Sequence, residues 1–224
     1  MNIDDGKDGA TQRPYVLLPS GNIIDLANSD PNSWNDHDLA LGLSRTYRWG
    51  GHSAWSRPLS VAQHSLAVLA IREQGSPGLP PGLAFYELLH DAEEGLLGFD
   101  CIAPLKALLG APFAQLCSRL TAAINERYAL PELTADEYRL HKTADRIAAA
   151  SEALHIVGWS MPQIANDLHL SAAPLVLDPL AMLAEEGGFQ PWEPWPSEYA
   201  GAQWLHRLQH ERNRFDPDVR GNLP

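Results

Sequence analysis

Three separate segments of the sequence carry histidine and aspartate residues whose types suit a divalent metal ion. They are His64 in SVAQHS, the pair His90 and Asp91 in LLHDAEE, and Asp145 in KTADR. Imidazole nitrogens and carboxylate oxygens are ligands that such ions accept, and four of them leave positions open for water and substrate. Left unpaired in a core, these groups would cost several kcal/mol. We therefore predict that the four residues hold one divalent ion, which is Mn, Co, Mg, Fe, Ni or Zn.

A fifth residue, Glu94, follows His90 by four positions, so on a continuous helix both side chains would project from the same face. A carboxylate there can take a proton from metal-bound water and later return one to a leaving oxygen. The metal would lower the pKa of the water and screen the negative oxygens of a phosphoryl group. Glu94 is therefore the predicted catalytic residue.

Each segment alone also has an ordinary structural explanation. A single histidine in an apolar helix, such as His64 within residues 61–71, is more often a core residue than a ligand. A His-Asp dipeptide occurs by chance in many proteins, and Asp145 could pair with Lys142 or Arg146. The metal hypothesis depends on the joint occurrence of all three segments.

Composition limits the classes of function. The chain has 224 residues, enough for one domain with a substantial core, and its net charge of −12 argues against a groove for a nucleic-acid polymer. A small anionic substrate remains compatible, because a bound cation reverses the local field. Cys101 and Cys117 lack the CxxC spacing of a zinc knuckle, so we expect reduced thiols.

The N-terminal residues MNIDDGKDGA lack the apolar region of a signal peptide, and no apolar run approaches the roughly 18 residues of a membrane span. We therefore expect a cytoplasmic protein that does not enter a membrane. Trp192, Trp195 and Trp204 could pack as a cap or form an oligomer contact, and we expect a homo-oligomer.

The pattern of apolar residues predicts an all-α fold with one possible small β-hairpin near the N-terminus. Residues 1–13 read as a flexible tail, and residues 14–224 as a single domain whose motifs lie within 36–155. Thr134 and Glu137 form a capping-box pattern at the start of a long helix. The hairpin is expected at about 15–26, and helices at about 36–50, 60–71, 83–97, 112–128, 135–157, 178–187 and 197–212.

The segments SVAQHS, LLHDAEE, DCIAPLK and KTADR together resemble the HD-domain phosphohydrolase superfamily, whose signature is H…HD…D. The resemblance covers about residues 36–155 and is closer to the YfbR-like 5′-deoxynucleotidases and the small phage dATP triphosphohydrolases. It implies a bundle of antiparallel helices with the metal at its centre. It also implies the ligand roles for His64, His90, Asp91 and Asp145, and the catalytic carboxylate role for Glu94.

The resemblance further implies substrate-binding residues. Arg48 and Trp49 match an Arg-Trp pair that lies over the substrate in the nucleotidases, and Asp100 looks like the aspartate that binds the sugar. An arginine suits a phosphate because its planar fork donates several hydrogen bonds. Lys106, which follows an aligned proline, is a candidate phosphate ligand. His52 lies in a Gly-rich loop and either contacts the leaving group or only caps a turn.

Two departures from the family pattern leave the number of substrate phosphates open. Phe99 is one extra residue between the His-Asp pair and Asp100, and the loop at residues 49–55 is longer than in the nucleotidases and closer to the phage enzymes. The chain beyond about residue 160 has no counterpart in the family pattern. A triphosphate would need more cationic partners than a monophosphate; the candidates are Arg45, Arg48, Arg57 and Lys106.

The favoured function is therefore hydrolysis of a 5′-deoxynucleoside monophosphate, a small nucleotide, to nucleoside and phosphate. The first alternative is removal of triphosphate from a deoxynucleoside triphosphate. An alternative of another class is a non-catalytic HD module that binds a nucleotide as a sensor. A cyclic-nucleotide diesterase is a further possibility, but two-metal HD diesterases need additional histidine ligands, and no such set is obvious.

Overall fold

The computed structural model describes residues 14–215 and shows an all-α fold with one short hairpin, as predicted. The predicted tail at residues 1–13 lies outside the described residues, as do residues 216–224 at the end of the predicted domain. The hairpin pairs β1 (Tyr15–Leu17) with antiparallel β2 (Ile23–Asp25). The helices are α1 (Asp36–Arg45), α2 (Val61–Gly75), α3 (Pro81–Leu89), α4 (Ala92–Leu97), α5 (Ala103–Tyr128), α6 (Ala135–Glu152), α7 (Met161–Asn166), α8 (Ala181–Glu186) and α9 (Ser197–Phe215), with a 3-10 turn η1 (Arg48–Gly51) and a π-helical turn η2 (Ala153–Val157).

Helix starts follow from local capping chemistry. Asn35 and Asp38 form a reciprocal capping box at the start of α1, and Thr134 and Glu137 form the predicted one at α6. The hydroxyl of Ser60 accepts from the backbone N–H of Gln63 at the start of α2. Each cap satisfies a backbone donor that a helix start leaves without a partner. These helices, which include those that carry His64 and Asp145, therefore begin at well-defined positions.

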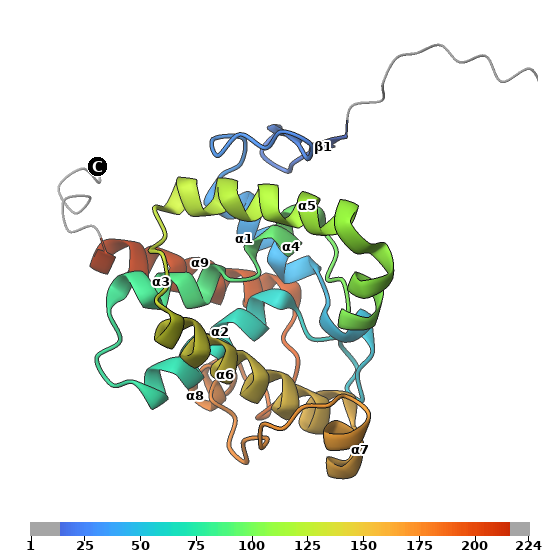
Figure 1. Ribbon diagram of the computed structural model, residues 1–224. Coiled ribbons are helices and arrows are strands. Elements are labelled where there is room, and N and C mark those ends of the chain that lie inside the picture. The colour runs from blue at the N-terminus through green and yellow to red at the C-terminus, as the bar shows by residue number, and fades with distance from the viewer. Residues whose placement is uncertain (1–13, 216–224) are drawn as a thin grey trace, which may run out of the picture.

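Helix α2 is the centre of the bundle. It packs against α1, α3, α6 and α9, and in the view of Figure 1 it lies between α5 at the top and α6 below. Residues on all sides of α2 are buried, from Val61 to Leu66 without a break. A helix that is enclosed all round has no solvent face on which to place a polar side chain. His64 is consequently fully buried.

Two of the three C-terminal tryptophans belong to this core. Trp195 and Trp204 are buried in the main hydrophobic cluster, while Trp192 stacks on His155 with ring centroids 4.5 Å apart. Of the two alternatives for the tryptophans, packing within the fold is confirmed for Trp195 and Trp204, which are buried and offer no surface for an oligomer contact. Burial of such large rings adds much apolar area to the core.

The predicted single helix at residues 83–97 is wrong, because α3 ends at Leu89 and α4 begins at Ala92. Asp91 lies between them with φ −112° and ψ 24°, outside the helical region. The apolar periodicity continues across this break, so the sequence pattern did not reveal it. The break places two consecutive polar side chains at the junction of two helices.

A close backbone approach joins α4 to α1. A Cβ atom at Gly42 would overlap the carbonyl oxygen of Gly95, and a Cβ atom at Gly95 would lie 2.7 Å from Cγ of Leu43 and 2.9 Å from its backbone nitrogen. No other residue type fits at either position without moving a helix. The two glycines therefore set the distance between α1 and the helix that carries Glu94.

We expect Gly42→Ala to destabilise the protein by about 1–3 kcal/mol or more, because the added methyl group meets backbone rather than a flexible side chain. Chemical denaturation followed by circular dichroism would measure the loss. Gly75→Ala is the matched control, since a Cβ atom at that helical glycine has no neighbour within 4 Å. A Gly42→Ala protein that unfolds at the same denaturant concentration as the wild type would contradict the close contact.

Helix α5 is the most exposed long helix, and by length and composition its stretch Leu105–Tyr128 could cross a membrane. Its mean hydropathy is 1.2, and 17% of the window is buried. The stretch is not a regular helix, because Gly110 (φ 64°, ψ −150°) breaks the helical backbone and Pro112 follows it. The expected helix start at residue 112 is therefore wrong, because the Gly and Pro residues, which are typical of a connection, lie inside α5.

Candidate metal centre

Two buried imidazole rings each offer one nitrogen that has no hydrogen-bond partner. His64 is fully buried in α2, and His90 lies directly after α3. Nδ1 of His90 is 2.7 Å from the backbone carbonyl oxygen of Glu87, so it is the nitrogen that donates, and its Nε2 has no hydrogen-bond partner. Nε2 of His64 also has none, while its Nδ1 faces Glu152. Buried polar atoms are rarely left in this state unless a ligand or water completes them.

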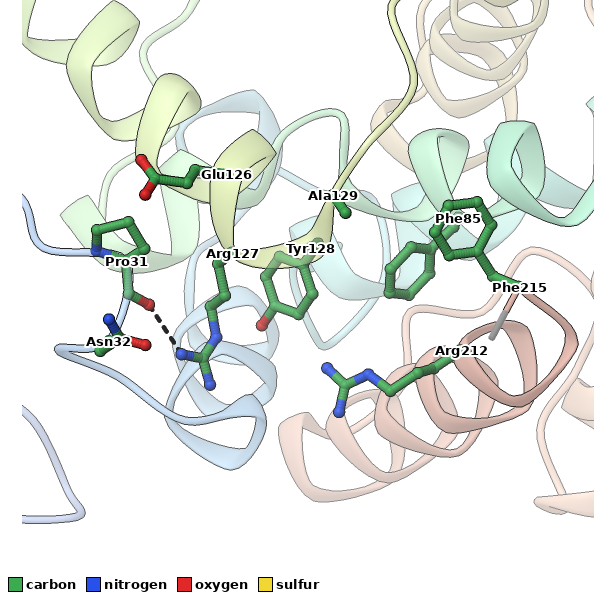
Figure 2. Close-up of a pocket in the computed structure, with 9 residues that line it drawn as sticks. All are labelled: Pro31, Asn32, Phe85, Glu126, Arg127, Tyr128, Ala129, Arg212 and Phe215. Carbon is green, nitrogen blue, oxygen red and sulfur yellow. Dashed lines mark hydrogen bonds between the residues drawn. The ribbon is translucent and has the colours of Figure 1, made fainter. Parts of the chain in front are cut away.

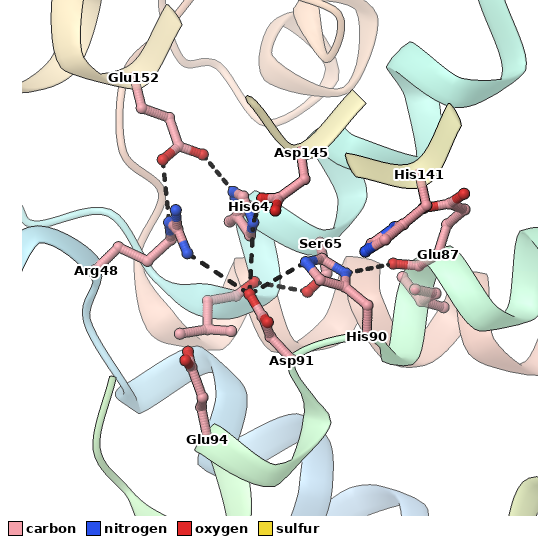
Figure 3. A network of polar contacts seen from close by, with 12 residues as sticks. Arg48, His64, Ser65, Glu87, His90, Asp91, Glu94, His141, Asp145 and Glu152 are labelled. Carbon is pink, nitrogen blue, oxygen red and sulfur yellow. Dashed lines mark hydrogen bonds and ion pairs between the residues drawn. The ribbon is translucent and has the colours of Figure 1, made fainter. Parts of the chain in front are cut away.

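Two carboxylates lie beside these nitrogens (Figure 3). Oδ2 of Asp91 is 3.1 Å from Nε2 of His90 and 3.6 Å from Nε2 of His64. Oδ1 of Asp145, from α6, is 3.6 Å from Nε2 of His64. His64, His90 and Asp145 each offer an atom within 4.8 Å of the others, a group that could hold a metal ion. The structure thus brings all four predicted ligands to one point.

The break between α3 and α4 explains how consecutive residues face that point. His90 directly follows α3 and still has helical backbone angles, whereas Asp91, directly before α4, has a non-helical backbone. Within one regular helix the two side chains would diverge by about 100°. The prediction that His90 and Glu94 share one helix face is wrong for the same reason, since the break separates them.

The candidate ligands strongly shift one another's pKa values. Burial and the nearby Arg48 would lower the pKa of His64, but Glu152 and Asp145 raise it to about 9. Burial would likewise lower the pKa of His90, yet Asp91 raises it. Burial would raise the pKa of Asp145, but His64 and His90 hold it well below its usual range. These shifts show that the carboxylates favour positive charge at this position, which a bound metal ion would supply.

Glu94 approaches this group from α4, and Figure 3 shows its carboxylate pointing toward Asp91 and Arg48. It is buried, one of its oxygens has no partner, and the other is 3.4 Å from Nζ of Lys106. Burial, followed by the charges of Asp91 and Asp100, raises the pKa of Glu94 to about 9. A carboxyl that holds its proton so strongly can act as an acid, and a nearby cation would lower its pKa.

Arg48 and Trp49, predicted to lie over the substrate, both bind a residue that the sequence analysis did not select. Nε of Arg48 and Nε1 of Trp49 each donate to Oε2 of Glu152 at 3.0 Å. Nη1 of Arg48 lies 3.6 Å from Asp91. Burial would lower the pKa of Arg48, but Glu152 and Asp91 outweigh it and raise the pKa. Contact of either side chain with a substrate stays a prediction.

The other predicted substrate residues lie around the same site at different depths. The charge of Asp100 acts on Arg48, Glu94 and Lys106, which places it near all three. The side chain of Lys106 is half exposed at 50%, so it combines its contact to Glu94 with access to solvent. His52 is exposed directly after η1. No measured contact brings His52 to the ligands among the described residues.

Three buried residues, Glu152, Glu87 and His141, lie beside the candidate ligands, and neither glutamate was predicted from the sequence. Glu152 follows Asp145 by seven residues, two turns along α6, and holds His64. Glu87 holds His90 through its backbone and His141 through its side chain, with Nδ1 of His141 at 2.7 Å. His141 is itself buried, with its ring 5.0 Å from that of His90.

A separate pocket of about 510 Å³ lies where α5 and α9 end, and none of its lining residues belongs to the candidate metal centre (Figure 2). Its two arginines already have partners. Arg212 forms a two-bond pair with Asp36, and Arg127 donates to the carbonyl oxygen of Pro31. The pocket therefore shows neither the ligand chemistry nor the unpartnered groups of the metal centre.

Comparison with known proteins identifies a relative of this chain but does not indicate an activity. Over 150 residues the chain is 38% identical to an uncharacterized protein of Rhodobacter capsulatus, and the match covers 66% of this chain and 76% of that protein. The chain belongs to the same family as that protein. No family model matches the chain. The geometry of the site therefore has to carry the functional argument.

Adding Mn²⁺ should raise the melting temperature, because the ion would bind the assembled site and not the unfolded chain. At a free concentration roughly 100 times Kd the stabilisation is about 2.7 kcal/mol. For a domain of this size that corresponds to about 5–11 °C. Differential scanning fluorimetry with and without EDTA would measure it, with K⁺ at equal ionic strength as the control. An unchanged melting temperature with Mn²⁺, Co²⁺, Mg²⁺ and Zn²⁺ would contradict a metal site.

Proposed function

We propose that this protein is a metal-dependent HD-domain phosphohydrolase that acts on a small nucleotide. Its preferred reaction would convert a 5′-deoxynucleoside monophosphate to nucleoside and phosphate. The observation that carries this proposal is the meeting of two buried, unpartnered imidazole nitrogens, of His64 and His90, with the carboxylates of Asp91 and Asp145. The motifs that resemble the superfamily are the segments that supply these residues.

The donor set fits a divalent ion on chemical grounds. Two neutral imidazoles and two carboxylates suit ions such as Mn²⁺, Co²⁺ and Zn²⁺, and the two unpartnered Nε2 atoms are both aimed at the carboxylates. When bound, such an ion would supply Lewis-acid chemistry, lowering the pKa of water and offsetting the charge of phosphoryl oxygens. The exposed fraction of Asp91 and Asp145, 21% for each side chain, leaves the site open to solvent and substrate.

The remaining residues can position a phosphate and move a proton. Glu94 would accept the proton of the attacking water and return it to the leaving oxygen of the sugar. Arg48 uses Nε for Glu152 and its Nη1 lies 3.6 Å from Asp91, so Nη2 is the nitrogen that would donate to a phosphoryl oxygen. Lys106 would add a second positive charge from the solvent side. Two cations and one proton-handling carboxyl are a sufficient set for a monophosphate.

The structure reduces the support for a triphosphate substrate. Arg57, one of the four cations considered for the extra phosphates, donates from Nη2 to Glu193 at 2.5 Å and from Nε to the carbonyl oxygen of Pro194. The carboxylate of Glu193, which lies outside the candidate metal centre, thus offsets the charge of Arg57. Because a triphosphate needs more cationic partners than a monophosphate, the engagement of Arg57 away from the candidate metal centre supports the monophosphate as the proposed substrate.

One assay tests the proposal. The purified full chain would be incubated with Mn²⁺, Co²⁺ or Mg²⁺ and a panel of deoxynucleoside mono- and triphosphates and cyclic nucleotides. Release of inorganic phosphate from monophosphates is the expected result. Release of inorganic triphosphate would overturn the monophosphate preference in favour of the alternative enzyme. Nucleotide binding with no turnover under any metal would overturn the enzyme and support a non-catalytic sensor.

A further inference from the structure

Glu152 faces two different parts of the site with its two oxygens (Figure 3). Oε1 is 2.5 Å from Nδ1 of His64, and Oε2 accepts hydrogen bonds from Arg48 and Trp49. We propose that Glu152 is a positioning residue that holds the metal ligand His64 and the turn of Arg48 and Trp49 at once. Metal affinity and the order of that turn then depend on one carboxylate. This inference rests on the proposed metal centre, but not on the hydrolytic reaction.

On one side, Glu152 determines which nitrogen of the His64 ring is free for a metal ion. A metal ion takes an imidazole through the lone pair of one nitrogen, and the hydrogen bond of the other nitrogen selects which one. Donation from Nδ1–H to Glu152 leaves the lone pair on Nε2, which faces Asp91 and Asp145. His64 is fully buried, so water cannot substitute for Glu152 as the acceptor.

On the other side, Glu152 supports the backbone of η1. Trp49, Gly50 and Gly51 have φ values of 57°, 62° and 79°, three successive residues in the left-handed region. For a side chain such as tryptophan this conformation costs about 1–2 kcal/mol. The indole N–H donates to Glu152, and the ring packs against the cluster that contains Ala150. The end of α6 thus holds the turn in a conformation that it would not adopt alone.

A carboxylate is the only side chain of this length that can serve both sides. Glutamate offers two acceptor oxygens, whereas glutamine offers one oxygen and one NH₂ donor. In Glu152→Gln the NH₂ group must therefore face either Nδ1 of His64 or the two donors of Arg48 and Trp49. A role as mere core filler would tolerate this isosteric change, so the variant separates the two roles.

Two readouts other than catalysis test the inference on the full chain. Calorimetry measures the Kd for Mn²⁺ alone, and hydrogen exchange of the metal-free protein measures the order of residues 48–52. Glu152→Ala should raise the Kd by about 10- to 100-fold and accelerate exchange in the turn. Glu152→Gln should lose at least one of the two properties, and it keeps the test valid if the alanine variant fails to fold. Trp49→Phe removes only the indole donor, so it should accelerate exchange while raising the Kd less.

Glu211→Gln is the matched control, because Glu211 is another fully buried carboxylate with arginine partners, on α9. It should change neither readout. If both Glu152 variants bind Mn²⁺ with wild-type affinity and exchange at the wild-type rate, the inference is overturned. A wild-type protein that binds Mn²⁺ but hydrolyses no nucleotide would overturn the proposed function alone. A wild-type protein that binds no divalent ion would overturn both.

Discussion

Asp145→Ala should abolish the Mn²⁺-dependent rise in melting temperature and reduce nucleotide hydrolysis to the background rate. Asp145 supplies one of the carboxylates that face Nε2 of His64, and it lies on a different helix from the other candidate ligands. Without its carboxylate, α6 would supply none of the four candidate ligands. Loss of a supporting partner of a ligand costs about 10- to 100-fold in metal affinity, so loss of the ligand itself should exceed that range.

Asp136→Ala is a suitable control for this experiment. Asp136 is on the same helix, but its side chain is 78% exposed, and its ion-pair partner among the described residues is Arg139. Calorimetric Mn²⁺ titration and phosphate release should be unchanged in that variant. Wild-type Mn²⁺ affinity in Asp145→Ala would show that the ion, if bound, is held elsewhere.

Glu94→Gln should keep Mn²⁺ binding and lower the rate of nucleotide hydrolysis by about 10²- to 10⁴-fold, the usual contribution of a general acid–base group. The amide has nearly the shape of the carboxyl but can neither accept nor release a proton at neutral pH. Glu94 is not among the groups that meet at the candidate metal position, so metal affinity should change little. Parallel measurements of kcat and of the Kd for Mn²⁺ separate the two effects.

The same substitution one residue earlier provides the comparison. Glu93 is partly buried, and burial, followed by the charge of Asp91, raises its pKa to about 7. Because α4 turns by about 100° per residue, Glu93 and Glu94 point in different directions. Glu93→Gln should therefore retain the rate within a few-fold. Equal losses in both variants would mean that the helix was disturbed and that Glu94 has no specific proton-handling role.

The meeting of the four candidate ligands could be predicted from sequence because their residue types are costly to bury without a partner. His64 lies in an almost wholly apolar stretch, and the His-Asp pair ends another. Periodicity also identified α2, α6 and the hairpin. It missed the break at Asp91, because apolar residues continue in register on both sides of it, and a helix break is a matter of backbone angles at one residue.

The supporting groups could not be predicted, because their partners are far away in the sequence. Glu152 lies 88 residues from His64 and 104 from Arg48, within an alanine-rich helix where a glutamate normally faces solvent. Its position two turns after Asp145 was the only available signal, since that spacing places both on one face of α6. The role of Trp49 was assigned by resemblance alone, and its contact with Glu152 became visible only in three dimensions.

The close approach of Gly42 and Gly95 has a consequence for any survey of random mutants of this protein. A screen that scores colonies for phosphatase function should find both glycines nearly as intolerant as the histidines, although neither has a side chain. Gly95 immediately follows Glu94, and a shift of α4 away from α1 would displace that carboxyl along with the helix. In such a screen, loss of function at these two positions would reflect the distance between α1 and α4. Catalytic residues would have to be identified from variants that still bind the metal ion but no longer hydrolyse the substrate.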